Sequence, residues 1–182
     1  MLQLAVFAIG SAGLVLFSRP ALRVRRTHGF YRFFAFESIL ALIVLAAPRW
    51  FRDPLSARQI ASWLLLLSSL LLAAHGFYLL RVIGRPQGQF ENTTRLVTRG
   101  AYRTIRHPLY SSLLLLGWGA FLKSSSPAGL RSTASLAVAL ALAASAALFA
   151  TARVEEGENL ARFGAEYAAY MKTTRMFVPW LF

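Results

Sequence analysis

The sequence predicts an all-α integral membrane protein: a helical bundle of about five transmembrane helices, followed by an amphipathic helix at the membrane interface. The chain has 182 residues, of which 57% are hydrophobic, compared with roughly 45–50% in soluble domains. The apolar residues are concentrated in five runs, residues 2–17, 30–47, 59–83, 109–122 and 128–152. Because a helix needs about 20 apolar residues to cross a bilayer, the short first and fourth runs make the number of spans approximate.

One membrane domain is expected over residues 1–182, because no Gly/Ser linker or charged tract divides the chain. Residues 1–83 would supply three spans. Residues 84–182 would supply a polar loop rich in glycine and proline, two further spans and the amphipathic helix. The helix after the loop is expected to begin at Pro108, since proline at the first helical position has no amide hydrogen to leave unbonded.

The distribution of charge predicts the orientation in the membrane. The chain carries 20 Lys and Arg residues and a net charge of +13. With five spans and the N-terminus outside, fifteen of the 20 basic residues fall on one side. Cytoplasmic loops are enriched in Lys and Arg, so that side, with the C-terminus, is expected to be cytoplasmic. The strong preference for Arg over Lys, with many Ala and Leu, suggests a GC-rich bacterial genome and hence the inner membrane.

Composition also argues against several classes of partner. No nucleic acid is expected, because the positive charge comes with no RNA-binding motif and no soluble basic face. The chain has no cysteine, which excludes disulfides and thiolate metal sites. Its histidines, His28, His75 and His107, lack the spacing of metal ligands, so no metal site is expected.

Two polar clusters lie where spans meet the cytoplasmic face. The first is Arg106-His107-Pro108-Leu109-Tyr110, and the second is Glu155-Glu156. Ionisable residues at a bilayer edge are costly to desolvate and therefore commonly mark a site. We expect the clusters to form a polar pocket for a charged small molecule, open toward lipid. Free amides at the start of the helix near His107 would favour an anionic group.

The C-terminal region carries one apolar stripe. Leu160, Phe163, Tyr167 and Tyr170 recur at intervals of three, four and three residues, which predicts an amphipathic helix. This helix should lie on the cytoplasmic interface and partly cover the pocket. After it, the terminal residues 180–182 are expected at the interface.

Two further ionisable residues lie at matching depths in the second and third spans. Glu37 and His75 are expected either to pair across antiparallel helices or to serve the site, and the sequence leaves both open. His28 is expected in a solvated basic loop.

The ordered motifs resemble a known membrane family. Leu96-Val97-Thr98-Arg99-Gly100-Ala101-Tyr102 leads into the Arg-His-Pro cluster, and the Glu pair is followed by Phe163-Gly164 and by Tyr167 and Tyr170. This order resembles the isoprenylcysteine carboxyl methyltransferases and their phospholipid methyltransferase relatives. The resemblance covers roughly residues 84–182.

The resemblance implies transfer of a methyl group from S-adenosylmethionine to a lipophilic or small amphipathic acceptor at the cytoplasmic face. In this family the cofactor lies in a cytoplasmic pocket and the acceptor arrives from the membrane lipid between helices. Arg106 would face the cofactor carboxylate or the acceptor and, with Glu156, would be catalytic. The cofactor-binding residues implied are Leu96, Val97, Gly100, Tyr102, His107, Tyr110, Glu155 and Glu156.

Two other functions remain open at this point. A sterol-reductase-like oxidoreductase using NADPH resembles the same C-terminal architecture, but typically carries asparagine at the position of Leu109. A non-enzymatic membrane protein would leave the dense polar clusters without a purpose. Nothing in the sequence names the acceptor.

Overall fold

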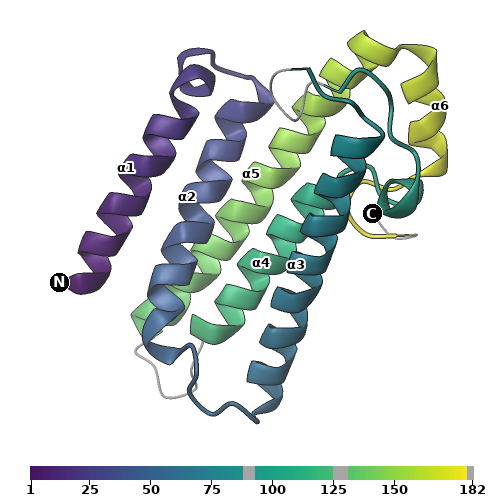
Figure 1. Ribbon diagram of the computed structural model, residues 1–182. Helices are drawn as coiled ribbons and strands as arrows, with labels where there is room; N and C mark the ends of the chain where they lie inside the picture. The colour runs from purple at the N-terminus through teal and green to yellow at the C-terminus, as the bar shows by residue number, and fades with distance from the viewer. Residues whose placement is uncertain (88–92, 125–130, 180–182) are drawn as a thin grey trace.

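The computed structural model describes residues 1–87, 93–124 and 131–179. Five long helices lie side by side and alternate in direction, and a short sixth helix caps one end of the bundle (Figure 1). The α-helices are α1 (Leu2–Arg23), α2 (His28–Ala46), α3 (Ala57–Val82), α4 (Pro108–Ser124), α5 (Arg131–Phe163) and α6 (Ala165–Thr173). Two 3-10 turns, η1 (Ala47–Arg49) and η2 (Gly100–Arg103), lie between them. We call the end that holds the α1–α2 turn, residues 93–107 and α6 the site end.

The protein is an integral membrane protein. Within the described part of the chain, four helices are long and apolar enough to cross a bilayer: α1, α2 with η1, α3 and α5. The fifth, α4, has 17 residues, so the expected count of five spans is approximate. It begins at Pro108, as predicted, and it packs against α2, α3 and α5 in the middle of the bundle.

Small residues allow the helices to approach closely. The alanines of α5 pack against α2 and α4: Ala137 and Ala141 share one buried cluster with Leu42, and Ala152 shares another with Ala35. This is the packing role expected for small residues in lipid.

Interhelical hydrogen bonds join α3 to α4. Ser62 Oγ donates to the Gly119 carbonyl at 2.7 Å, and Ser69 Oγ donates to the Ser112 carbonyl at the same distance. Such bonds between membrane helices are worth about 0.6–2 kcal/mol each. They fix α4 against α3 and so fix the position of the Arg-His-Pro segment that precedes it.

A buried lysine closes the end opposite the site. Lys123 Nζ donates to Gln59 Oε1 at 2.7 Å and to the Trp50 carbonyl at 3.3 Å. It also lies 3.7 Å from the centroid of the Trp63 ring, a cation–π geometry. The ammonium group of Lys123, near the end of the short helix α4, is therefore hydrogen-bonded inside the protein and does not have to reach solvent.

The C-terminal helix is present, but it begins later than the stripe predicted. Helix α5 continues through the Glu pair to Phe163, and Gly164, with φ +55°, turns the chain into α6. The stripe is thus divided between two helices: Tyr167 and Tyr170 are buried in α6, whereas Leu160 is 38% exposed on α5. The expected interfacial position of residues 180–182 lies outside the described residues.

Of the two alternatives left open for Glu37 and His75, the pairing across helices does not form. Glu37 Oε1 accepts a hydrogen bond from Ser11 Oγ of α1 at 3.0 Å, and His75 Nε2 accepts one from the Ala101 amide at 3.4 Å. The expectation that His28 lies in a solvated loop is also wrong. His28 is the first residue of α2, and its Nδ1 lies 2.6 Å from Oε2 of Glu158 on α5. The matching depths of Glu37 and His75 in two spans did not show which face of its helix each side chain occupies.

Candidate active site

The C-terminal segment holds the Arg-His-Pro segment in place. The Arg106 amide donates to the Arg175 carbonyl at 2.7 Å, and the His107 amide donates to the Met176 carbonyl at 3.2 Å. In return the Arg175 amide donates to the Thr104 carbonyl at 3.0 Å, which makes a short parallel pairing. The amides just before α4 are therefore satisfied by protein carbonyls, and we assign no anion to them.

The loop before α4 is fixed to α3 through one glycine. Gly100 has φ +58°, and a Cβ placed there would lie 2.5 Å from His75 Nε2. The next amide, of Ala101, donates to that same nitrogen. Val97 and Tyr102 pack on Leu79 of α3 on either side of this contact. His75 therefore positions the loop and does not reach the pocket.

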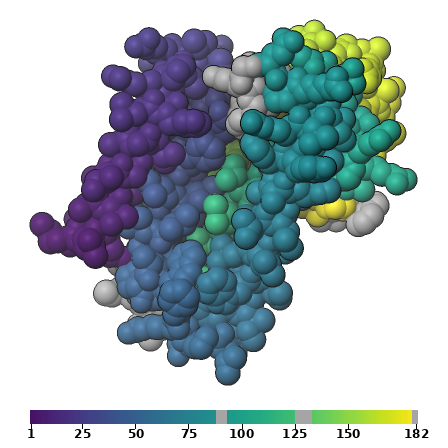
Figure 2. Space-filling view, in the orientation of Figure 1, coloured from purple at the N-terminus to yellow at the C-terminus, as the bar shows by residue number. Residues whose placement is uncertain are grey.

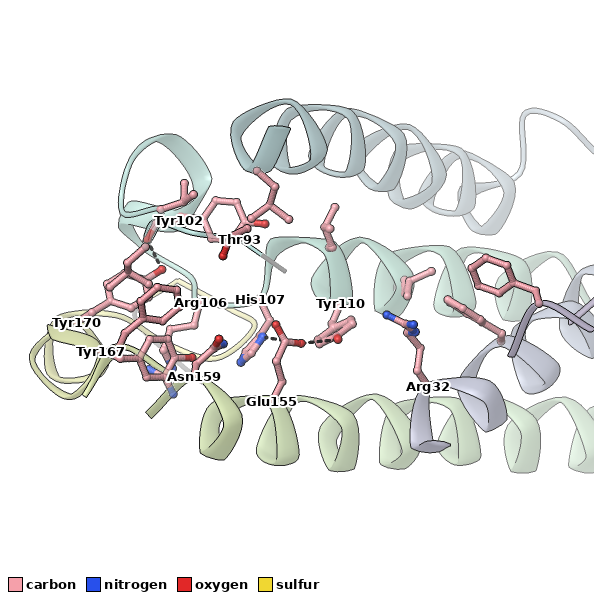
Figure 3. Close-up of a pocket in the computed structure, with 18 residues that line it drawn as sticks. Arg32, Thr93, Tyr102, Arg106, His107, Tyr110, Glu155, Asn159, Tyr167 and Tyr170 are labelled. Carbon is pink, nitrogen blue, oxygen red and sulfur yellow. Dashed lines mark hydrogen bonds and ion pairs between the residues drawn. The ribbon is translucent and has the colours of Figure 1, made fainter. Parts of the chain in front are cut away.

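A pocket opens at the site end among α1–α6 and the loop (Figure 3). Its polar part is bounded by residues of the loop, α4, α5 and α6. Its other part lies among apolar side chains of α1, α2, α3 and α4. The described residues that line it are Phe17, Arg32, Phe36, Leu80, Thr93, Leu96, Val97, Tyr102, Arg106, His107, Leu109, Tyr110, Leu113, Glu155, Asn159, Phe163, Tyr167 and Tyr170.

The two polar clusters meet at Glu155. The Tyr110 hydroxyl donates to Glu155 Oε2, and His107 Nδ1 lies 4.0 Å from the same oxygen. The His107 and Tyr110 rings are stacked, with centroids 5.4 Å apart. The Glu155 side chain is 27% exposed and points into the pocket (Figure 3). A carboxylate held in this way is available to a cationic ligand.

Its neighbour Glu156 has a different place. Glu156 does not line the pocket, and its side chain is 3% exposed. Its Oε1 accepts from Arg106 Nε at 2.7 Å, and its Oε1 lies 3.6 Å from His107 Nε2. Consecutive residues on a helix point about 100° apart, and of the two carboxylates only Glu155 lines the pocket. Contact of Glu156 with a cofactor stays a prediction.

Arg106 also has several partners within the protein. Besides the bond to Glu156, its Nη1 donates to the carbonyls of Thr174 at 2.6 Å and Met171 at 3.3 Å. A cation at the C-terminus of α6 stabilises the last, otherwise unbonded carbonyls of that helix. Arg106 borders the pocket, but its guanidinium joins α5, α6 and the loop, so we describe it as a positioning residue.

Three tyrosines form the aromatic side of the pocket. The Tyr170 hydroxyl donates to the Tyr102 carbonyl at 2.6 Å, and the Tyr167 and Tyr170 rings lie 5.8 Å apart. Burial is the main cause that raises the pKa of Tyr102, Tyr167 and Tyr170 well above that of a free phenol. They are neutral aromatic surfaces at physiological pH.

The structure brings together most of the residues that the sequence indicated. Seven line the pocket, namely Leu96, Val97, Tyr102, Arg106, His107, Tyr110 and Glu155. Gly100 and Glu156 do not, because one is docked on His75 and the other is paired with Arg106. Among the described residues there is no group of three or more His, Cys, Asp or Glu that could hold a metal ion.

Sequence reasoning missed three polar residues of the pocket: Arg32, Thr93 and Asn159. Asn159 lies four residues after Glu155, one turn along the same face of α5, and that spacing would have identified it. Arg32 lies on α2. Its only signal was charge, which we had attributed to membrane orientation.

Comparison with known proteins identifies the family. The sequence model of the phospholipid methyltransferase family matches residues 57–157, more than half of the chain. The chain belongs to the phospholipid methyltransferase family. The match runs from the start of α3 to just past Glu156, and so includes the loop, α4 and both polar clusters. Neither the curated proteins nor the solved structures gave a match.

Membership confirms the resemblance seen in the sequence and assigns the protein to a family of membrane methyltransferases. Helices α1, α2 and α6 lie outside the matched residues. Part of the pocket of this methyltransferase is therefore built by segments that the family match does not describe.

Proposed function

We propose that the protein transfers a methyl group from S-adenosylmethionine to a lipophilic or small amphipathic acceptor at the cytoplasmic face of the membrane. The observation that carries the proposal is the single pocket in which both polar clusters meet. At one end it presents Glu155, Asn159 and tyrosine rings, and at the other it presents apolar side chains of α1, α2, α3 and α4.

The residues present fit such a cofactor. Its sulfonium and ammonium groups are cations, which the carboxylate of Glu155 and the faces of Tyr102 and Tyr167 would attract. Asn159 offers an amide to a ribose or amino-acid group. The cofactor carboxylate is not expected at Arg106, since Nε and Nη1 of that guanidinium are bonded to protein oxygens.

The bound cofactor would supply an electrophilic methyl group on a positively charged sulfur. What this chain contributes is alignment and exclusion of water, because an in-line displacement depends mainly on the approach of the two reacting atoms. A carboxylate or thiolate acceptor needs no base. An amine acceptor must first lose a proton, which in this proposal His107 Nδ1 or Glu155 would take. Glu156 is less suited because it is bonded to Arg106.

The proposed orientation rests on the position of the site and on the distribution of charge. The α1–α2 turn, the loop and α6 lie at the same end of the bundle (Figure 1). Together with the adjoining helix ends they carry fifteen of the 20 basic residues, which supports a cytoplasmic position of the site end under the positive-inside rule. We infer that the membrane is a bacterial inner membrane.

The test is calorimetry of S-adenosylmethionine and S-adenosylhomocysteine on detergent-purified protein. Glu155→Gln should weaken binding of S-adenosylmethionine about tenfold or more, because a hydrogen bond to a charged group is worth roughly 1.5–3 kcal/mol. Glu166→Gln, which changes an exposed carboxylate of α6, should leave binding unchanged. Glu156→Gln should reduce thermal stability more than it reduces affinity.

Two results would contradict the proposal. One is wild-type protein that binds neither adenosyl ligand. The other is binding of NADPH alone, which would favour the reductase alternative. Equal affinity in wild type and Glu155→Gln would keep the reaction but remove Glu155 from the cofactor site.

A further inference from the structure

A second pocket lies at the site end, separate from the first. It is lined by three cations and two hydroxyl-bearing residues, namely Arg103, Lys172, Arg175, Thr104 and Thr173. None of these five residues lines the first pocket. The proposed methyl transfer therefore gives them no role.

The second pocket is built where the loop before α4 meets the C-terminal segment. Arg103 is the last residue of η2, and Lys172 and Thr173 end α6. The Arg175 amide donates to the Thr104 carbonyl at 3.0 Å and so brings the two segments together. In the space-filling view the loop, in teal, adjoins α6, in yellow, at the edge of the molecule away from α1 (Figure 2). Each segment thus supplies part of the wall of the pocket.

The three cations are unpaired within the described part of the chain. Arg103, Lys172 and Arg175 are exposed, and their side chains make no hydrogen bond or ion pair with another described residue. The residues that line the pocket include no carboxylate. Like charges around one cavity repel one another, and an anion between them would relieve that repulsion.

Two simpler reasons for positive charge do not account for this pocket. The terminal carbonyls of α6 favour a cation, but Arg106 Nη1 already donates to the carbonyls of Met171 and Thr174. The positive-inside rule explains an excess of Lys and Arg on one side of the membrane. It does not explain why three cations from two segments converge on one cavity.

The donors around the pocket indicate the class of ligand. Thr104 Oγ1 donates to the Ala101 carbonyl at 3.3 Å, and Thr173 Oγ1 donates to the Tyr170 carbonyl at 3.0 Å. The two guanidinium groups and the ammonium group are therefore the donors left for a ligand. A phosphate group offers three acceptor oxygens and about two negative charges, and guanidinium binds it through parallel hydrogen bonds. A carboxylate has one charge and would leave the other cations unmatched.

We propose that the second pocket binds a phosphate group and thereby joins η2 to the end of α6. Tyr102 of η2 and Tyr170 of α6 line the first pocket, so occupancy of the second pocket would stabilise this wall of the first. The inference does not rest on methyl transfer, because it uses no residue of the proposed cofactor site.

The position of the pocket leaves two sources for the phosphate group. Thr104 lies shortly before Pro108, the first residue of the membrane-embedded α4, and hence near the depth of the lipid headgroups. The phosphate comes either from an anionic headgroup of the membrane or from a soluble phosphate compound. The two sources share the chemistry that the pocket recognises, and the experiment separates them.

The soluble probe is pyrophosphate, titrated at constant ionic strength into protein in neutral detergent. Arg103→Gln/Arg175→Gln should bind it about tenfold or more weakly than wild type, the effect of losing at least one charge-assisted hydrogen bond. Arg103→Lys/Arg175→Lys should keep part of the affinity, since it keeps the charges but not the parallel bonds. Both positions are exposed, so the variants should unfold at the wild-type temperature without ligand.

The membrane source is tested in nanodiscs of phosphatidylcholine with and without phosphatidylglycerol. If a headgroup is the ligand, phosphatidylglycerol should raise the thermal midpoint of wild type and slow hydrogen exchange in residues 100–107 and 172–177. It should do neither in Arg103→Gln/Arg175→Gln. If a soluble compound is the ligand, pyrophosphate should produce both effects in phosphatidylcholine alone, and phosphatidylglycerol should add nothing.

Arg23→Gln/Arg25→Gln is the matched control, because it removes two exposed arginines at the α1–α2 turn of the same end. It should respond to both probes as wild type does. Three outcomes would overturn the inference: wild type that responds to neither probe, an unchanged response in Arg103→Gln/Arg175→Gln, or an equal loss in the control. Binding without slower exchange in both segments would also overturn it, because the ligand would then not join them.

Discussion

At the scale of single residues, the loop depends on Gly100. Its φ of +58° is unfavourable for any residue with a Cβ, and such a Cβ would meet His75 Nε2 and Leu79. Gly100→Ala should therefore destabilise the protein by about 2–3 kcal/mol and weaken S-adenosylhomocysteine binding, because the loop carries Leu96 and Tyr102. Thermal unfolding in detergent and calorimetry measure the two effects.

Gly157→Ala is the matched control. Gly157 lies within α5, and an added Cβ would have nothing within 4 Å, so this change should be neutral or stabilise by about 0.5–1 kcal/mol. Equal effects of the two substitutions would show that Gly100 is not a special position.

The same scale shows what sequence patterns do and do not contain. The order of motifs indicated Tyr102, His107, Tyr110 and Glu155, because each is defined by its place in a short segment. The sequence could not show which of Glu155 and Glu156 faces the pocket, since the two adjacent residues differ only in the direction in which their side chains leave α5. Arg32 was missed because its partners come from distant helices, and only their packing shows that it enters the pocket.

At the scale of elements, α6 closes the polar half of the pocket through buried phenols. Burial raises the pKa of Tyr102 and Tyr170. These phenols therefore stay neutral in the folded protein at a pH at which the same phenols of the unfolded chain have begun to ionise. The stability they contribute is complete below about pH 10, the pKa of a free tyrosine, and is lost as pH rises above it. The expected loss is about 1.4 kcal/mol per pH unit for each phenol.

The thermal midpoint measured from pH 8 to pH 11.5 should therefore be flat at first and then fall. The thermal midpoint of Tyr170→Phe should fall less steeply with pH, since one ionising phenol has been removed. A midpoint that stays level through pH 11.5, or a variant with the wild-type slope, would be inconsistent with this assignment.

The elements themselves were largely predictable. Long apolar runs predicted the spans, and Pro108 fixed the start of α4. The division between α5 and α6 was misplaced because two adjacent glutamates are typical of the end of a span. Helix α5 instead continues past them, with Glu155 facing the pocket and Glu156 paired with Arg106. The actual break is Gly164, whose positive φ has no signal in the apolar pattern.

At the scale of the whole molecule, the orientation can be tested with single cysteines, because the chain has none of its own. Leu55→Cys and Ala165→Cys place thiols at opposite ends of the bundle, at exposed positions, without changing any charge. In intact cells a membrane-impermeant maleimide should label the first only, and the second should react after permeabilisation. The reverse pattern would place the site outside the cytoplasm.

The pairing of residues 104–107 with 175–176 has a consequence for biosynthesis. Arg106 and His107 are synthesised before α5, yet the carbonyls that accept hydrogen bonds from their amides belong to Arg175 and Met176, beyond α6. A nascent chain inserted up to α5 therefore holds an Arg-His-Pro segment with unbonded amides and an arginine without its carbonyls. The pocket therefore cannot take its final form until residues 174–177 have left the ribosome and paired with the segment that precedes α4.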